Sequence, residues 1–179
     1  MKKFKILVAI TVLATTLVGC PDDILPAFDI TEDLTHEVPV EVTATANGDC
    51  IDYSESFTFD MRLNSQINDN FDLIDNISIN SITWEVTNYN GDDGVYINSG
   101  LLKVGGTTFE VGKVDLKAAD DGNEMFVLTD AAKLTAISNE FKSNGSMMVI
   151  LEVSSGGNCD NDHSYILKFT IDVKVRVQP

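Results

Sequence analysis

The sequence predicts a mainly β protein: an antiparallel β-sandwich of immunoglobulin-like architecture, with about eight strands and one helix near residues 130–143. Two observations carry this prediction. Stretches of alternating apolar and polar residues recur along the chain, separated by turn-forming clusters of Asn, Asp and Gly. Only one stretch has clear helical spacing over several turns. A small antiparallel barrel is the alternative architecture for the same pattern.

The alternation begins near residue 35, and we expect one sandwich domain over residues 35–179. Residues 36–44 place valines on one face of a strand. Pro39 falls on the other face and favours an edge position, because proline cannot donate a hydrogen bond to a neighbouring strand. A second strand is expected over residues 53–62, where aromatic residues alternate with polar ones.

A short helix is expected next, with Asn64 or Ser65 as its N-terminal cap. The following stretch, residues 77–88, reads as a strand whose apolar positions change parity part of the way along. Because a change of parity moves the side chains to the opposite face, it predicts a β-bulge or a bend in this strand.

Residues 95–104 and 107–114 are expected to form a hairpin around Gly105 and Gly106. Both glycines can take a positive φ, as a tight two-residue turn requires. The predicted register pairs Val104 with Thr107 and Leu102 with Phe109.

Residues 117–123 are polar and read as a loop, before a short strand over residues 125–128. Thr129 is expected to cap the helix near residues 130–143, and Asn144 with Gly145 to end it. The last stretch has the strongest strand pattern in the chain. It alternates without a break over residues 165–177, which predicts a long strand inside a sheet.

The composition is strongly acidic, with 28 Asp and Glu against 12 Lys and Arg. All the acidic residues follow residue 19, whereas three basic residues precede it. The segment from Cys20 to Pro179 therefore has a formal charge of 9 − 28 = −19. Such a surface repels phosphate groups, so we expect no nucleic-acid partner.

Of the three cysteines, Cys50 and Cys159 both lie in turn-like sequences rich in Asn, Asp and Gly. Outside the cytoplasm such a pair is expected to be oxidised, and we predict a Cys50–Cys159 disulfide. The sequence shows no nucleophile elbow, phosphate-binding loop or zinc-protease motif. His36, assigned to the polar face of a strand, and His163, assigned to a turn, are expected at the surface, and the domain is expected to be non-catalytic.

The acidic turns are candidates for binding calcium, a cation that takes six to eight oxygen ligands. The predicted disulfide would bring four carboxylates together, which makes them the weak metal candidates: Asp49, Asp52, Asp160 and Asp162. Solvated turns are the preferred interpretation, so no cofactor is expected. Tyr89 and Tyr96 flank the turn at residues 90–94 and are weak candidates for ligand binding, whereas the parity of Trp84 places it in the core.

The N-terminus combines Lys2, Lys3 and Lys5 with an apolar run too short to span a bilayer. The run ends in Leu-Val-Gly-Cys at residues 17–20, which resembles the lipobox of bacterial lipoproteins. The resemblance implies a signal peptide over residues 1–19 and acyl chains on Cys20, which would anchor the protein to a membrane. The rest of the chain loosely resembles small lipoproteins of Bacteroidota.

Residues 20–34 are then an acidic lead-in between the anchor and the sandwich domain. We expect a lipid-anchored protein of the cell envelope, at the outer membrane, that acts as a binding or structural module. Its partner would be a protein or a glycan. A periplasm-facing accessory subunit and a hydrolase with an unrecognised site are the alternatives.

Overall fold

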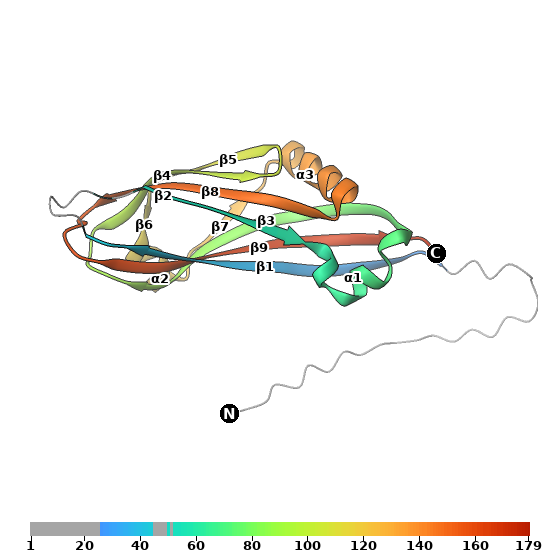
Figure 1. Cartoon of the computed structure of the whole chain (residues 1–179), viewed down its shortest axis with the longest axis horizontal. Coiled ribbons are helices and arrows are strands. Elements are labelled where there is room, and N and C mark those ends of the chain that lie inside the picture. Colours follow the sequence, from blue (N-terminus) through green and yellow to red (C-terminus); the bar gives the residue numbers. More distant parts are fainter. Residues whose placement is uncertain (1–25, 45–49, 51) are drawn as a thin grey trace, which may run out of the picture.

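The computed structural model describes residues 26–44, 50 and 52–179, and these residues form a β-sandwich of nine strands with short helices (Figure 1). The strands are β1 (Phe28–Val42), β2 (Asp52–Asp60), β3 (Ile74–Asn90), β4 (Val95–Val104), β5 (Thr107–Val111), β6 (Val114–Asp115), β7 (Met125–Leu128), β8 (Ser146–Gly157) and β9 (His163–Val177). The α-helices are α1 (Ser65–Asp69), α2 (Leu116–Gly122) and α3 (Ala131–Asn144).

The first sheet has the strand order β1-β9-β3-β7 and the second has the order β2-β8-β4-β5, with β6 also paired to β4. All of these pairs are antiparallel. The predicted mainly β antiparallel sandwich is therefore confirmed. Its connectivity is not that of an immunoglobulin domain, in which the first two strands pair in one sheet. Here β1 and β2 belong to different sheets, and the order is that of a jelly roll.

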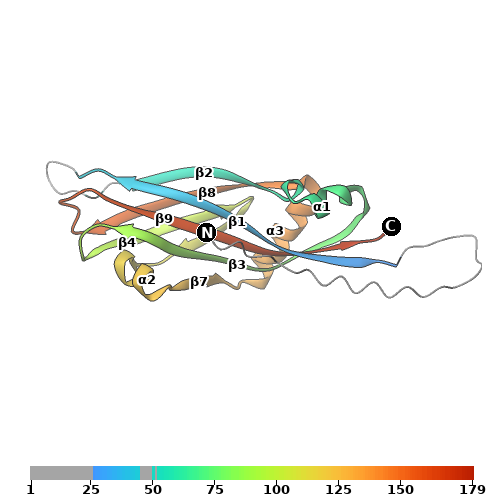
Figure 2. The same ribbon diagram turned by 90° about the horizontal axis from the view of Figure 1, so that it is seen from below.

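The sandwich is elongated, and its two ends differ in what they carry (Figures 1 and 2). At one end, which we call the base, the start of β1 pairs with the end of β9, Phe28 opposite Val177. At the other end, Val42 lies opposite His163. We call this second end the tip; it carries the connections β1–β2, β3–β4 and β8–β9.

The core lies between the sheets and is built by the alternation that the sequence shows. Every second residue of β9 from Tyr165 to Val177 is at most 2% exposed, and β9 lies between β1 and β3, as predicted. Strand β1 is an edge strand, which confirms the interpretation of Pro39. This strand begins at Phe28, so residues 28–34, assigned above to the lead-in, are part of the sandwich.

The predicted bulge and hairpin are both present. The register of β3 against β9 shifts between Ile79 and Ser81, where the apolar positions change parity. Strands β4 and β5 pair with Val104 opposite Thr107 and Leu102 opposite Phe109.

Two local predictions about helices are wrong. Residues 117–123 form most of helix α2 and its C-terminal end rather than a loop, with the Asp115 side chain accepting a hydrogen bond from the Ala118 N–H. The cap of α3 is Asp130, not Thr129, because the Asp130 carboxylate accepts from the N–H groups of Ala132 and Lys133. Within the described residues, no helix is long and apolar enough to span a membrane.

The remaining helix predictions are confirmed. Asn64 caps α1 through a hydrogen bond from the Ile67 N–H. Gly145 ends α3 with a φ of 70°, a left-handed conformation that glycine adopts without a Cβ clash. Helix α3 packs on β3, and the buried Ser138 hydroxyl accepts a hydrogen bond from the Ile79 N–H at 3.0 Å, next to the bulge.

Candidate functional site

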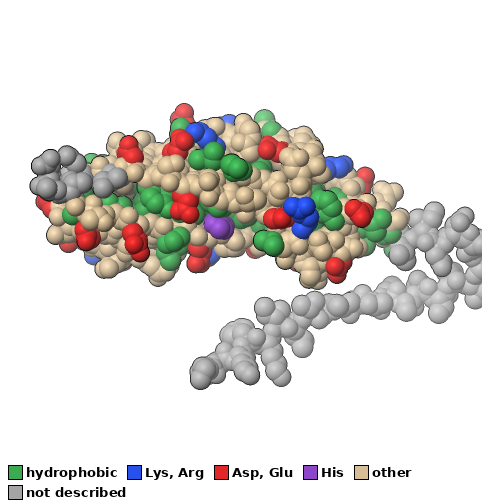
Figure 3. Space-filling view, viewed as in Figure 1, with side chains coloured by type: hydrophobic (Ala, Val, Ile, Leu, Met, Phe, Trp, Pro, Cys, Tyr) green, Lys and Arg blue, Asp and Glu red, His purple; other side chains and the backbone are tan. Residues whose placement is uncertain are grey.

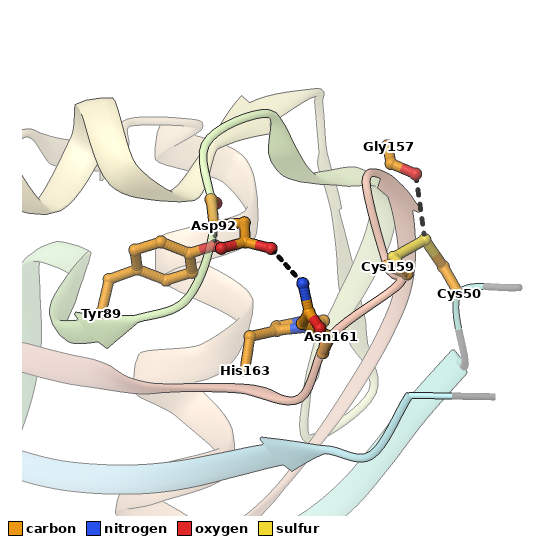
Figure 4. The surroundings of a disulfide bond; sticks show 7 residues. All are labelled: Cys50, Tyr89, Asp92, Gly157, Cys159, Asn161 and His163. Atoms are coloured by element: carbon orange, nitrogen blue, oxygen red, sulfur yellow. Dashed lines mark hydrogen bonds between the residues drawn. A yellow bond between two sulfur atoms is a disulfide. The ribbon is translucent and has the colours of Figure 1, made fainter. Parts of the chain in front are cut away.

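A disulfide joins Cys50 to Cys159 at the tip, as the sequence predicted (Figure 4). The two Cα atoms are 5.3 Å apart, within the usual range for a disulfide, and the residues are 109 positions apart in the sequence. Cys159 is 1% exposed, so the covalent link reaches from the surface into the end of the core. It ties the segment before β2 to the β8–β9 connection.

Hydrogen bonds add further links between the connections of the tip (Figure 4). The Tyr89 hydroxyl donates to the Asp92 carbonyl oxygen at 2.6 Å, and the Asn161 side chain donates to the Asp92 carboxylate at 2.5 Å. The Ala44 N–H donates to the Asp162 carboxylate at 2.7 Å. Residues from the β1–β2, β3–β4 and β8–β9 connections are thus held to one another.

Three of the four acidic metal candidates lie within the described residues. Asp49 lies outside the described residues. Asp52, Asp160 and Asp162 are exposed, and one carboxylate oxygen of Asp162 is used by the Ala44 N–H. No group of three or more His, Cys, Asp or Glu side chains suited to a metal occurs in the part of the chain that the structure describes. Calcium at the tip therefore stays a prediction.

The two tyrosine candidates, Tyr89 and Tyr96, flank the tip, and each ring already has a neighbour. Tyr89 is half-buried, and burial together with the nearby Asp92 raises its pKa to about 12. The Lys113 ammonium lies 3.6 Å from the centroid of the Tyr96 ring, a cation–π contact. A role for either tyrosine in ligand binding stays a prediction.

Both histidines are less exposed than the sequence analysis expected. His36 lies on the core-facing side of β1 and stacks on Phe57 with ring centroids 4.1 Å apart. His163 is 4% exposed and begins β9 on the same face as Tyr165. Their parity in the strands, shared with Val38 and Tyr165, was the available signal. Neither ring is hydrogen-bonded to a carboxylate or a hydroxyl among the described residues.

Beneath the tip, three buried polar atoms have no hydrogen-bond partner among the described residues. They are the Ser155 hydroxyl, the Nε2 atom of His163 and the Tyr165 hydroxyl. Burial raises the pKa of Tyr165 to about 12, so this side chain is neutral at physiological pH.

Trp84 is 4% exposed, which confirms its predicted place in the core. Its ring stacks on Phe126 of β7 with a centroid distance of 4.1 Å. The only tryptophan of the chain is therefore used in packing between neighbouring strands.

A groove of about 860 Å³ crosses the second sheet, and sequence reasoning did not find it. Its lining includes Ser54, Glu152, Leu101 and Glu110, which lie opposite one another in register across β2, β8, β4 and β5. The Lys103 ammonium lies 2.8 Å from the Glu152 carboxylate. Hydroxyls and carboxylates on one open face can bind a polar ligand. These four residues form a row across the sheet only through the register of four strands, which the sequence alone does not give.

Acidic side chains are spread along the face drawn in Figure 3, with Lys and Arg in only a few places. This distribution agrees with the charge of the sequence. Within the part of the chain that the structure describes, the exposed large apolar residues lie in several parts of the fold; they are Phe28, Leu63, Leu73, Met125, Val127 and Met148.

Comparison with known proteins supports the fold of the chain only. No protein-family model matches the chain, and no curated protein matches it. The crystal structure of a decameric BFDV capsid protein is similar, with a TM-score of 0.50 and 13% identity, covering 83% of this chain and 99% of that one. A desmodium yellow mottle tymovirus structure has a TM-score of 0.33 and 13% identity, covering 100% of this chain and 97% of that one. The first likeness supports the sandwich described above.

Proposed function

We propose that the chain is a lipoprotein of the bacterial cell envelope, anchored through Cys20, whose jelly-roll domain acts as a binding or structural module. The observation that carries the proposal is the Cys50–Cys159 disulfide. Disulfides are typical of proteins exported from the cytoplasm. Of the three cysteines in the chain, the pairing leaves only Cys20, the residue at the lipobox position.

The two ends of the sandwich suit such an anchor. Cys20 precedes Phe28, the start of β1, by eight positions, a span of at most about 28 Å. Strand β1 has 15 residues and extends roughly 45 Å from the base to the tip at ~3.3 Å per residue. A domain anchored at Cys20 would therefore be able to present the tip, with its disulfide, away from the membrane.

The charge of −19 on the segment after the signal peptide favours a protein or glycan partner over nucleic acid or anionic lipid, because like charges repel. The polar groove of the second sheet and the linked connections of the tip are surfaces on which such a partner could bind. The similar fold of a capsid protein supports the part of the proposal that gives the domain a structural role.

Metabolic labelling with an alkyne analogue of palmitate tests the anchor. The full chain, expressed in a Gram-negative host, should carry the label. The Cys20→Ala variant should lose it, and Cys50→Ala should keep it. Wild-type protein that reaches the envelope without label would contradict the proposal.

The side of the membrane is tested by protease treatment of intact cells. Loss of the protein from intact cells supports a surface-exposed binding module. Protection until the outer membrane is broken supports the alternative of a periplasm-facing accessory subunit, and crosslinking would then identify its neighbours in the envelope.

A further inference from the structure

The sandwich has edge strands on both sheets, and strand β7 differs from the others. Edge strands offer unpaired backbone groups to other chains, and charged residues or proline normally guard them. Three of the edges have such guards: Pro39 and five acidic residues in β1, three acidic residues in β2, and Glu110 in β5. Strand β7 reads Met-Phe-Val-Leu, without charge or proline.

Among the described residues, strand β7 pairs with β3 alone, from Leu128 opposite Ile82 to Met125 opposite Glu85. Because alternate residues of an antiparallel strand point their N–H and C=O groups to opposite sides, half of these groups in β7 face away from the sheet. Met125 is 57% and Val127 is 51% exposed. Figure 2 shows β7 along one long side of the sandwich, between α2 and α3.

A groove of about 380 Å³ runs beside this edge. Residues 110–114 of the second sheet line one side and β7 lines the other, with Trp84 and Phe126 contributing aromatic surface. Val111 and Val114 are buried in its wall. A strand added to β7 would direct every second side chain toward this groove, since side chains alternate between the two faces of a sheet. The groove therefore fits apolar side chains at alternate positions of an added strand.

The charges around the edge indicate what the added strand would carry at its ends. Glu124 precedes β7 and Asp130 follows it, both exposed, and Glu110 lines the groove. The cation in the lining is Lys113, whose ammonium lies over the Tyr96 ring. These four residues sum to 1 − 3 = −2. A second copy of the chain would bring the same negative charge, whereas a strand with basic ends would be attracted.

We propose that the β7 edge and its groove are a docking site for an extended segment of a partner protein, with apolar residues at alternate positions and basic residues at both ends. The segment adds to the first sheet as a strand, and backbone hydrogen bonds to β7 supply affinity while the groove selects side chains. The β7 site specifies a partner for the binding module proposed above, but binding at β7 does not require the lipid anchor.

The probes are three fluorescein-labelled peptides of the form Lys-Lys-X-Thr-X-Thr-X-Lys-Lys, with Val, Leu or Phe at X. Binding to the full chain, purified in mild detergent, is followed by fluorescence anisotropy. At least one peptide should bind saturably. The same peptide with Glu in place of Lys should bind at least tenfold more weakly.

Backbone methylation distinguishes strand addition from other modes of binding. One version of the bound peptide is N-methylated at the X residues and another at the Thr residues. In an added strand only one of the two sets faces β7, so one version should lose at least tenfold in affinity and the other should retain most of it. Equal affinities for the two versions would overturn the proposal.

Val127→Lys adds a guarding charge to β7 and should weaken binding at least tenfold. Met148→Lys is the matched control, because Met148 is 58% exposed but lies on the central strand β8 of the other sheet. It should change affinity less than twofold, with circular dichroism confirming that both variants fold.

Three further results would overturn the proposal: no binding by any of the three peptides, equal weakening by both lysine variants, or a dimer of the chain alone that Val127→Lys dissociates. The last result would make a second copy the occupant. Palmitate labelling of Cys20 is a separate readout, so failure at β7 is distinguishable from failure of the proposed anchor.

Discussion

Removal of the Cys50–Cys159 disulfide is expected to destabilise the domain strongly. The link joins residues 109 positions apart, and closing a loop of that length lowers the entropy of the unfolded chain by an amount worth about 5 kcal/mol at 25 °C in the chain-entropy model. For a domain of this size, that corresponds to a fall of about 10–20 °C in Tm. The double variant Cys50→Ala/Cys159→Ala is the appropriate change, because it leaves no unpaired thiol at the tip.

The assay is urea unfolding of the wild type and the double variant, each with and without reductant. Reductant should lower the free energy of unfolding of the wild type toward that of the variant and leave the variant unchanged. If the free energy of unfolding of the double variant is lower than that of the wild type by less than about 1 kcal/mol, the reasoning is refuted. Such a result would mean that the unfolded chain gains little conformational freedom when the disulfide is removed. Comparing m-values checks whether the unfolded states are equally expanded.

Three further outcomes follow from single side chains. Trp84→Ala should cost about 3–5 kcal/mol of stability in urea unfolding, because the ring is buried and stacks on Phe126. Asp130→Ala should cost about 1 kcal/mol while Thr129→Ala has little effect, because Asp130 caps α3. Burial raises the pKa of Tyr165 to about 12 from 10.0, so the unfolded state releases its proton first as pH rises. The contribution of Tyr165 to stability should therefore be constant below about pH 10 and fall by up to about 3 kcal/mol between pH 10 and 12. Tyr165→Phe should remove this share of the loss and leave the shares of Tyr53 and Tyr89, whose pKa values are also raised.

The sandwich could be predicted because alternation is a local signal. The stretch over residues 165–177 shows the core-facing residues of β9 one by one, and the parity change before Ile82 locates the bulge of β3. Helix α2 could not be recognised in the same way. Its buried residues are Leu116 and Ala119, which is too little apolar surface to produce a helical pattern.

The pairing of the strands within the two sheets could not be predicted from the sequence pattern. Strand β1 pairs with β9, more than a hundred residues later, and alternation is the same whichever sheet a strand joins. The same limit applies to the groove on the second sheet, whose row of Ser54, Glu152, Leu101 and Glu110 exists only through the register of four strands. His163, by contrast, shares its parity with Tyr165, but the turn residues before it concealed that signal.

The short length of β7 limits pairing between two copies of the chain through this unguarded edge. In a strand of four residues, only about two N–H groups and two C=O groups point away from the sheet. These are too few for stable pairing between two copies that repel each other. A partner strand gains more, because its ends meet Glu124 and Asp130 and its side chains meet the groove beside Phe126. The edge therefore discriminates between a second copy and a basic partner by charge, and added salt should narrow the difference in affinity between peptides with Lys and Glu at their ends.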